Sequence, residues 1–293
     1  NWSLIWIALS FLFNGLFWWA IKDTTGSVEL ANTKSLEFLT GYLIEKSLAV
    51  DNIFVFLMIF TYFAVPTNFQ KRVLMIGIIG AIVLRTVMIL VGGWLLAEFH
   101  WVLYIFAGFL IITGIKMLFS GDEEMDVAKN PVVKYISTHM RVTKELHDEK
   151  FFVKVPDDTT GKMVRAATPL FLALVVINLA DLVFAVDSVP AIFAITTDTF
   201  IVYTSNIMAI LGLRALYFAL AAMVHRFHYL KYALALVLVF IGSKIFVSDF
   251  MMNGDKFPPV LSLGVTFALI LGGIFFSLWK TRGEETSAPS HIV

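Results

Sequence analysis

The chain has 293 residues, of which 59% are hydrophobic and 15% are charged, with a formal net charge of +0 and a mean hydropathy of +0.83. Soluble domains are about 45–50% apolar and about 25% charged, so this composition excludes a soluble globular protein and indicates a polytopic membrane protein. The 293 residues contain no cysteine, which excludes disulfides, thiolate metal sites and thiol redox chemistry within them.

Apolar runs long enough to cross a bilayer recur along the whole chain, and a spanning helix needs about 20 such residues. The runs are continuous rather than alternating, which favours helices over the strands of a membrane barrel. We therefore expect an all-α polytopic membrane protein. Its eight predicted helices are residues 2–21, 36–65, 71–97, 100–120, 167–196, 200–225, 229–250 and 258–280.

The first run has neither a basic start nor a small-residue cleavage site, so it does not resemble a cleaved signal peptide. We expect residues 1–35 to form a peripheral helix and a loop, and residues 251–293 to form the last transmembrane helix and a tail. The chain begins with Asn rather than Met, so residues upstream are expected to be missing.

Lysine and arginine residues are concentrated on one side of the predicted spans. That side carries Lys71, Arg72 and the basic residues of 121–166, whereas the opposite loops carry three lysines, with Lys244 near a helix end. The positive-inside rule makes the basic side cytoplasmic. We therefore expect the C-terminus to be cytoplasmic.

Segment 121–166 is the one sizeable hydrophilic insertion, and we expect a solvated cytoplasmic linker with some helix. An alternative is a regulatory metal-sensing loop that uses His139, His147, Asp148 or Glu149. The chain contains no Gly-x-x-x-x-Gly-Lys-Ser/Thr phosphate-binding loop, which argues against ATP-driven transport by this chain alone.

Residues 36–120 and 167–250 form an internal repeat. The aligned landmarks are Glu45 with Asp181, Asp51 with Asp187, Asn52 with Ser188, Arg85 with Arg214, and Gly114-Ile-Lys116 with Gly242-Ser-Lys244. Each unit holds three predicted helices, and an odd number inverts the second unit relative to the first. The pattern predicts two inverted three-helix repeats plus peripheral helices, which is the plan of many secondary transporters.

Both repeats carry acidic residues inside an apolar helix, where ionisable groups are costly and usually functional. At about 100° per residue, the first acid of each motif shares a helix face with the polar residue seven positions later. These pairs are Glu45 with Asn52 and Asp181 with Ser188. Asn178 lies about 60° from Asp181, whereas the second acids, Asp51 and Asp187, lie about 120° from the first on a straight helix.

Pro190 follows the second motif and leaves the carbonyl of Val186 without its helical donor. We therefore expect the helix to be unwound there, with the freed carbonyl available beside the carboxylates as a ligand for a hard divalent cation. Phe54 occupies the matching position in the first repeat, so the break need not be symmetric.

The two motifs together favour a metal site made of oxygen ligands. The expected ligands are Glu45, Asp51, Asn52, Asn178, Asp181, Asp187 and Ser188, with Arg85 and Arg214 as counter-charges. Proximity of several acids raises some of their pKa values, which suits exchange of the cation for protons. The alternative is that the acids only pair with the two arginines and lock the helices together.

An all-oxygen site favours Mn²⁺, Ca²⁺ or Mg²⁺, and this chemistry alone does not separate Mn²⁺ from Ca²⁺. The six histidines lie at helix ends, in loops or in the tail, whereas a zinc or copper site in the core would be expected to use His or Cys. We expect no cofactor, no nucleic-acid partner and no enzymatic activity; the cation, protons and the lipid bilayer are the expected partners.

Two sequence motifs resemble the TerC family of integral membrane proteins, and within it the Alx-like branch of bacterial manganese exporters. They are Glu45-Lys-Ser-Leu-Ala-Val-Asp-Asn52 and Asp181-Leu-Val-Phe-Ala-Val-Asp-Ser-Val-Pro-Ala191. The resemblance covers nearly the whole chain. It implies Mn²⁺ efflux across the bacterial inner membrane, with the acids of both motifs as ion ligands, and one further helix upstream of Asn1.

The sequence therefore predicts a secondary-active exporter of divalent cations, with Mn²⁺ as the expected substrate and with proton coupling and alternating access. The alternative is a non-transporting membrane scaffold or metal-delivery partner linked to metal or tellurite resistance. That alternative would place the important residues in 121–166 and on exposed helix faces rather than in the buried motifs.

Overall fold

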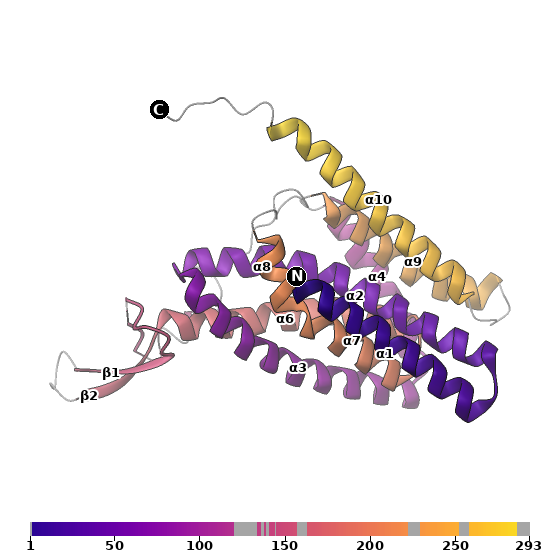
Figure 1. Ribbon diagram of the computed structural model, residues 1–293, viewed down its shortest axis with the longest axis horizontal. Coiled ribbons are helices and arrows are strands. Elements are labelled where there is room, and N and C mark those ends of the chain that lie inside the picture. The colour runs from indigo at the N-terminus through magenta and orange to yellow at the C-terminus, as the bar shows by residue number, and fades with distance from the viewer. Residues whose placement is uncertain are drawn as a thin grey trace.

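The computed structural model describes residues 2–119, 134–135, 138, 141–143, 145–156, 163–221, 229–251 and 258–285, without the side chains of Asp51, Phe54, Asp187, Met251 and residues 282–285. These residues form a helical bundle with one β-hairpin (Figure 1). The helices are α1 (Trp2–Thr25), α2 (Val28–Tyr62), α3 (Thr67–Glu98), α4 (Val102–Phe119), α6 (Pro169–Phe193), α7 (Thr199–Leu211), α8 (Leu213–Leu220), α9 (Leu230–Met251) and α10 (Pro259–Glu285).

Six of these helices are long and apolar enough to cross a membrane, or seven if the bent pair α7 and α8 is one span. Each of the eight predicted runs is helical over most of its described residues, but α2 is not among the six. It carries six charged residues along its 35 positions. Large apolar side chains are exposed along α1, α3 and α10, as expected where helices face lipid. The prediction of a polytopic helical membrane protein is confirmed.

Helix α2 begins earlier than the sequence predicts, inside the segment expected to be a loop. Ser27 caps it, because its hydroxyl accepts a hydrogen bond from the amide of Leu30 at 3.1 Å. Gly26 precedes this cap with a φ of +69°, a conformation that glycine adopts without steric cost. A two-residue connection can therefore reverse the chain between α1 and α2.

Helix α6 is continuous through Pro190, so the predicted unwinding there is wrong. Proline removes only one hydrogen bond from the helix, and helices in membranes tolerate it where neighbouring groups compensate. Here the flanking turns are held by close packing, since Ala185, Val189 and Ile192 are all buried against other helices. Continuity of the helix does not supply a donor, because Pro190 has no N–H, so the role of the Val186 carbonyl as a ligand stays a prediction.

The predicted span 200–225 is two helices rather than one. α7 and α8 meet at Gly212 with a bend of 42°. Asp198 caps the start of α7, where its carboxylate accepts a hydrogen bond from the amide of Phe200 at 3.1 Å. The bend changes the direction of the chain just before Arg214, which affects one of the predicted site residues.

Segment 121–166 has helical residues at 134, 135 and 138, as expected, but it also contributes to a β-hairpin that the sequence did not predict and that corrects the all-α fold class. Strands β1 (Phe152–Pro156) and β2 (Met163–Ala167) pair in antiparallel register, with Lys154 opposite Arg165. The hairpin projects past one end of the bundle (Figure 1). The residues just before β1 contact α3 through an ion pair between Arg72 and Glu149 at 3.2 Å.

The core is divided unevenly between the two ends of the bundle. Near the hairpin, α2, α3, α6 and α8 share a large apolar cluster that includes Phe56, Phe60, Leu170 and Tyr217. Toward the other end, Ile44 of α2 packs with residues of α4, α6, α9 and α10. The hairpin end is therefore closed by a thick apolar layer.

Helices α4 and α9 pack through reciprocal glycine contacts. A Cβ on Gly114 would lie 2.7 Å from the carbonyl oxygen of Ala235 and from a methyl of Val239. A Cβ on Gly242 would lie 2.6 Å from the carbonyl oxygen of Ala107 and 2.8 Å from Ile111. Gly114 and Gly242 are 128 positions apart in the chain, and so are their contact residues Ala107 and Ala235, and Ile111 and Val239. The inverted repeat as a whole remains a prediction.

Candidate functional site

A buried ionic cluster surrounds Arg85 in the middle of α3. The side chain is 1% exposed, and its guanidinium binds Asp181 of α6 in a bidentate manner. Nε donates to one carboxylate oxygen at 3.1 Å, and a terminal nitrogen donates to the other at 2.9 Å. This two-point geometry is the strongest way for arginine to bind a carboxylate.

The other terminal nitrogen of Arg85 connects the remaining members of the cluster. It donates to the Glu45 carboxylate of α2, to the Ser188 hydroxyl of α6 at 3.3 Å, and to the Asn206 amide oxygen of α7 at 3.2 Å. The Asn206 amide nitrogen in turn donates to the second oxygen of Glu45 at 3.3 Å. One guanidinium thus links four helices.

The cluster has an excess of negative charge. Glu45 and Asp181 are both buried, and within the cluster as described a single guanidinium balances the two carboxylates. Charges out of water are stable only when they are paired and hydrogen-bonded, and removal of one partner is strongly destabilising. Arg85 therefore stabilises the acids at this depth, and its role as the counter-charge of a metal site stays a prediction.

Four of the predicted site residues meet at this point: Glu45, Asp181, Ser188 and Arg85. Two predicted amide ligands lie nearby on the same helices but outside the hydrogen-bonded cluster. Asn52 is buried, and Asn178 donates to the Leu174 carbonyl at 2.9 Å and packs over Gly80. Neither side-chain oxygen, of Asn52 or of Asn178, has a hydrogen-bond partner among the described residues.

Asp51 and Asp187, the second acids of the two motifs, have helical backbones, but their side chains lie outside the described residues. Among the side chains that are described, no group of three His, Cys, Asp or Glu residues is placed to hold a metal ion. The alternative loop site is also not seen among the described side chains. His139 lies outside the described residues, and Glu149 pairs with Arg72. The metal-ligand set therefore stays a prediction.

Arg214, the second predicted counter-charge, does not join the cluster. It lies exposed on α8, where a terminal nitrogen contacts the Met75 sulfur at 3.7 Å. The break at Gly212 accounts for this, because α8 diverges from α7 just before Arg214. Asn206 of α7, which the sequence analysis missed, occupies the position beside Glu45 and Arg85 instead.

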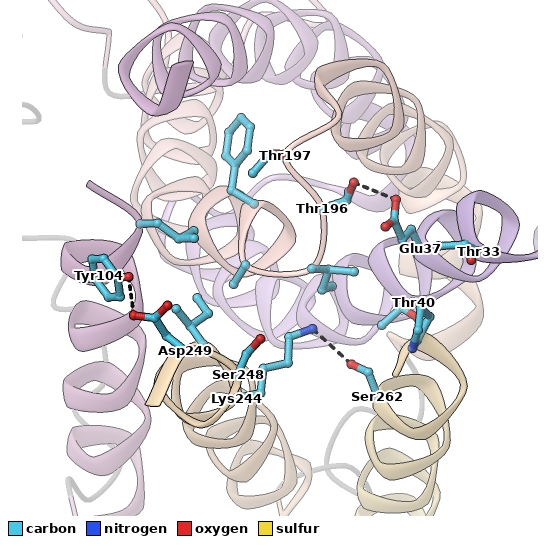
Figure 2. Close-up of a pocket in the computed structure, with 16 residues that line it drawn as sticks. Thr33, Glu37, Thr40, Tyr104, Thr196, Thr197, Lys244, Ser248, Asp249 and Ser262 are labelled. Atoms are coloured by element: carbon cyan, nitrogen blue, oxygen red, sulfur yellow. Dashed lines mark hydrogen bonds between the residues drawn. The ribbon is translucent and has the colours of Figure 1, made fainter. Parts of the chain in front are cut away.

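A cavity of about 420 Å³ (Figure 2) is lined by residues near the start of α2 and the end of α9, at the end of the bundle opposite the hairpin (Figure 1). Its polar lining comes from α2, α4, α9, α10 and the segment after α6. These residues are Thr33, Glu37, Thr40, Tyr104, Thr196, Thr197, Lys244, Ser248, Asp249 and Ser262. Glu37 is 4% exposed and Lys244 is 8% exposed, so both are charged groups held inside the bundle.

Glu37 is not among the site residues predicted from the sequence. A signal was present, since Glu37 lies eight residues before Glu45 on the same predicted helix. Eight residues correspond to a rotation of about 80° and a rise of about 12 Å, so the two acids are on neighbouring faces at different depths. Lys244 was noted only as a landmark of the repeat.

Comparison with known proteins agrees with this membrane architecture. The model of the family described as "Integral membrane protein TerC family" matches residues 30–285. The "Putative membrane-bound redox modulator Alx" of Escherichia coli (strain K12) is 50% identical over 278 residues, which cover 95% of this chain and 83% of that protein. Its Salmonella typhi counterpart is 49% identical over 285 residues, covering 97% and 85%.

A relative with lower sequence identity is similar over nearly the whole chain. An uncharacterized membrane protein of Myxococcus xanthus is 43% identical over 287 residues, covering 98% of this chain and 84% of that protein. No solved structure matches the chain.

Proposed function

This chain belongs to the TerC family of integral membrane proteins, and we propose that it is a secondary-active exporter of divalent metal cations, with Mn²⁺ as its main substrate. Export by proton exchange and alternating access is part of the proposal. The observation that carries it is the convergence of Glu45 and Asp181, from two different helices, at one buried point inside the bundle.

The chemistry of this point suits a hard cation. Carboxylate, hydroxyl and amide oxygens come together from α2, α6 and α7, and Mn²⁺, Ca²⁺ and Mg²⁺ prefer such ligands. Acids at membrane depth are costly to maintain and mark ion pathways. Ser188 and Asn206 accept from the remaining donors of Arg85, and their oxygens add two neutral ligands for a cation beside the two carboxylates.

Arg85 gives the proposed site a means of exchange. In the state described, the guanidinium occupies both carboxylates, so an arriving cation competes with Arg85 for the same oxygens. The empty site is thereby protected from the cost of two unpaired buried charges. We propose that Arg85 withdraws when the cation or protons neutralise Glu45 and Asp181.

Two features of the fold support alternating access. The α4–α9 contacts repeat reciprocally at equivalent positions, as they would around an approximate two-fold axis within the membrane. The bundle is also closed by an apolar cluster at the hairpin end and hollowed by the cavity at the other. With the basic side in the cytoplasm, this is a state whose cavity faces away from the cytoplasm.

The names of the Alx relatives attribute a redox role to those proteins. The 293 residues of this chain contain no cysteine, so thiol chemistry of these residues cannot provide such a role. The buried ionic cluster also weighs against a membrane scaffold that acts through segment 121–166, because a scaffold has no need of charges at this depth.

Transport into sealed vesicles tests the proposal. Purified protein is reconstituted into liposomes that contain a Mn²⁺-sensitive dye, and quenching is followed after Mn²⁺ is added outside. We expect Glu45→Gln, Asp51→Asn, Asp181→Asn and Asp187→Asn to abolish quenching. Glu29→Gln is the matched control, because Glu29 is exposed in the first turn of the same helix as Glu45.

Two results would contradict the proposal. If the four variants transport as well as the wild type, the site assignment is wrong. If deletion of the hairpin segment abolishes function while the acid variants retain it, the protein acts as a scaffold or metal-delivery partner.

A further inference from the structure

The cavity at the end opposite the hairpin carries a second buried acid that the Arg85 cluster does not use. Glu37 of α2 projects from the cavity wall, and one of its carboxylate oxygens accepts hydrogen bonds from the Thr196 hydroxyl at 2.8 Å and the Lys34 ammonium at 3.2 Å. These contacts hold the carboxylate in place. Figure 2 shows Glu37 at the cavity with Thr196 beside it.

The rest of the polar lining is mostly hydroxyl groups. Thr33, Thr40, Thr197, Ser248 and Ser262 contribute them from four different parts of the fold (Figure 2). Asp249 also lines the cavity, where it accepts a hydrogen bond from the Tyr104 hydroxyl at 2.6 Å. A cavity of about 420 Å³ with this lining has room for a cation that keeps part of its water shell.

Lys244 places a positive charge in the same cavity. Its ammonium donates to the Ser262 hydroxyl at 3.2 Å and reaches the cavity from α9, whereas Glu37 reaches it from α2. The two acids and one lysine of the lining sum to a charge of −1, and this balance is unchanged when Lys34, which pairs with Glu37, is counted together with its second partner Asp198. That balance attracts a cation, and the fixed ammonium prevents the cation from being held too tightly to leave.

The cavity lies close to the Arg85 cluster along two helices. On α2, Thr40 lines the cavity and Glu45 follows five residues later, which is a rise of about 7.5 Å. Ile44 of α2 and Ala191 of α6 pack in one apolar cluster with residues of α4, α9 and α10. The cavity and the buried acids are thus between one and two helical turns apart along α2.

We propose that this cavity is a second, transient binding site for a divalent cation, held there by Glu37 and the surrounding hydroxyl groups after it leaves the Glu45–Asp181 site. The inference rests on the proposed export function for its direction of travel. It assigns to Glu37 a role in release and to Lys244 a role in limiting how long the cation stays.

Thiol labelling tests this inference directly, because the 293 residues contain no cysteine and an introduced one has no background. Ser248→Cys places a thiol of similar size in the cavity lining. The rate of its modification by a charged, membrane-impermeant methanethiosulfonate is measured in vesicles, with and without Mn²⁺. Ser47→Cys is the matched control, since Ser47 is buried on α2 and does not line the cavity.

We expect Ser248→Cys to be modified only from the side opposite the hairpin, and Ser47→Cys not to be modified. Mn²⁺ at ten times its dissociation constant should slow modification about tenfold, because only the unoccupied cavity reacts. Adding Glu37→Gln should remove this protection, whereas adding the exposed control Glu29→Gln should keep it. Adding Lys244→Met should shift half-protection to lower Mn²⁺ concentrations.

The outcomes separate the two proposals. Unchanged modification rates in vesicles that transport Mn²⁺ would overturn the cavity site and leave the export function standing. A Ser248→Cys variant that is not modified at all would likewise overturn the cavity site and leave the export function standing. Protection by Mn²⁺ in vesicles that do not transport it would support the cavity site and refute export. Protection that survives Glu37→Gln would refute the role of Glu37.

Discussion

Substitution of Arg85 by methionine should destabilise the protein more than any other single change in the bundle. The guanidinium makes two hydrogen bonds to Asp181, one to Glu45, one to Ser188 and one to Asn206. Its loss leaves two buried carboxylates without the cation that balances them. Breaking a buried charge pair in this way costs about 3–5 kcal/mol.

Thermal unfolding in detergent measures this loss. At about 2–4 °C per kcal/mol, the expected decrease in the unfolding temperature is about 10 °C for Arg85→Met. Arg214→Met is the matched control, because Arg214 is exposed and contacts the Met75 sulfur, and surface changes stay within about 0.5 kcal/mol.

A compensated variant separates charge from packing. Glu45→Gln and Asp181→Asn, introduced together with Arg85→Met, remove all three charges and keep the side-chain volumes close to the original. If uncompensated charge is the cause, this triple variant should recover most of the lost stability. Equal unfolding temperatures for wild type and Arg85→Met would refute the account of the cluster, as would a triple variant that unfolds lower still.

Three further predictions concern the scaffold, each measured by thermal unfolding in detergent. Gly114→Ala should destabilise by about 1–3 kcal/mol, since its Cβ would lie 2.7 Å from a backbone oxygen. Gly108→Ala, with open space around it, should be neutral or stabilising by up to about 1 kcal/mol. A loss of stability in both variants would argue against close α4–α9 packing. Ser27→Ala should cost about 1 kcal/mol by removing the cap of α2, and no loss would mean that water replaces it. Arg72→Gln should cost less than about 1 kcal/mol, because both partners of its ion pair with Glu149 are more than 40% exposed; a larger loss would show that the hairpin is docked by this pair.

The helix positions and the central acids were predictable because both follow from local rules. A continuous apolar run determines a spanning helix, and a seven-residue spacing places Asp181 and Ser188 on one face, where both contact Arg85. The convergence of Glu45 with these residues followed from the repeat alone. Each of these arguments uses neighbours in the chain or an internal alignment.

The wrong or missed predictions at Pro190, Arg214 and Glu37 all depend on contacts between segments that are far apart in the sequence. Pro190 removes one hydrogen bond in any helix, but packing of α6 against its neighbours keeps the helix intact. Arg214 aligns with Arg85 in the sequence, but after the bend at Gly212 it lies exposed on α8 and contacts the Met75 sulfur rather than the hydrogen-bonded cluster. Glu37 becomes a cavity residue only because α9 and α10 place Lys244 and Ser262 in the same cavity.

The hairpin was missed for a different reason. The β-branched residues Val153 and Val155 on either side of Lys154, followed by a glycine at position 161, are a strand and turn signal. The segment as a whole is hydrophilic, and its mixed charge outweighed this short pattern in the expectation of a linker.

The central claim is that Glu45 and Asp181 are ligands of a divalent cation. Anomalous scattering at the manganese edge, from crystals of the protein grown with Mn²⁺, tests it most directly. The account predicts a peak between α2 and α6, within coordination distance of both carboxylates and with Arg85 displaced from at least one of them. A peak confined to segment 121–166, or no peak between α2 and α6 in Mn²⁺-saturated crystals with Arg85 still bound to both acids, would contradict it.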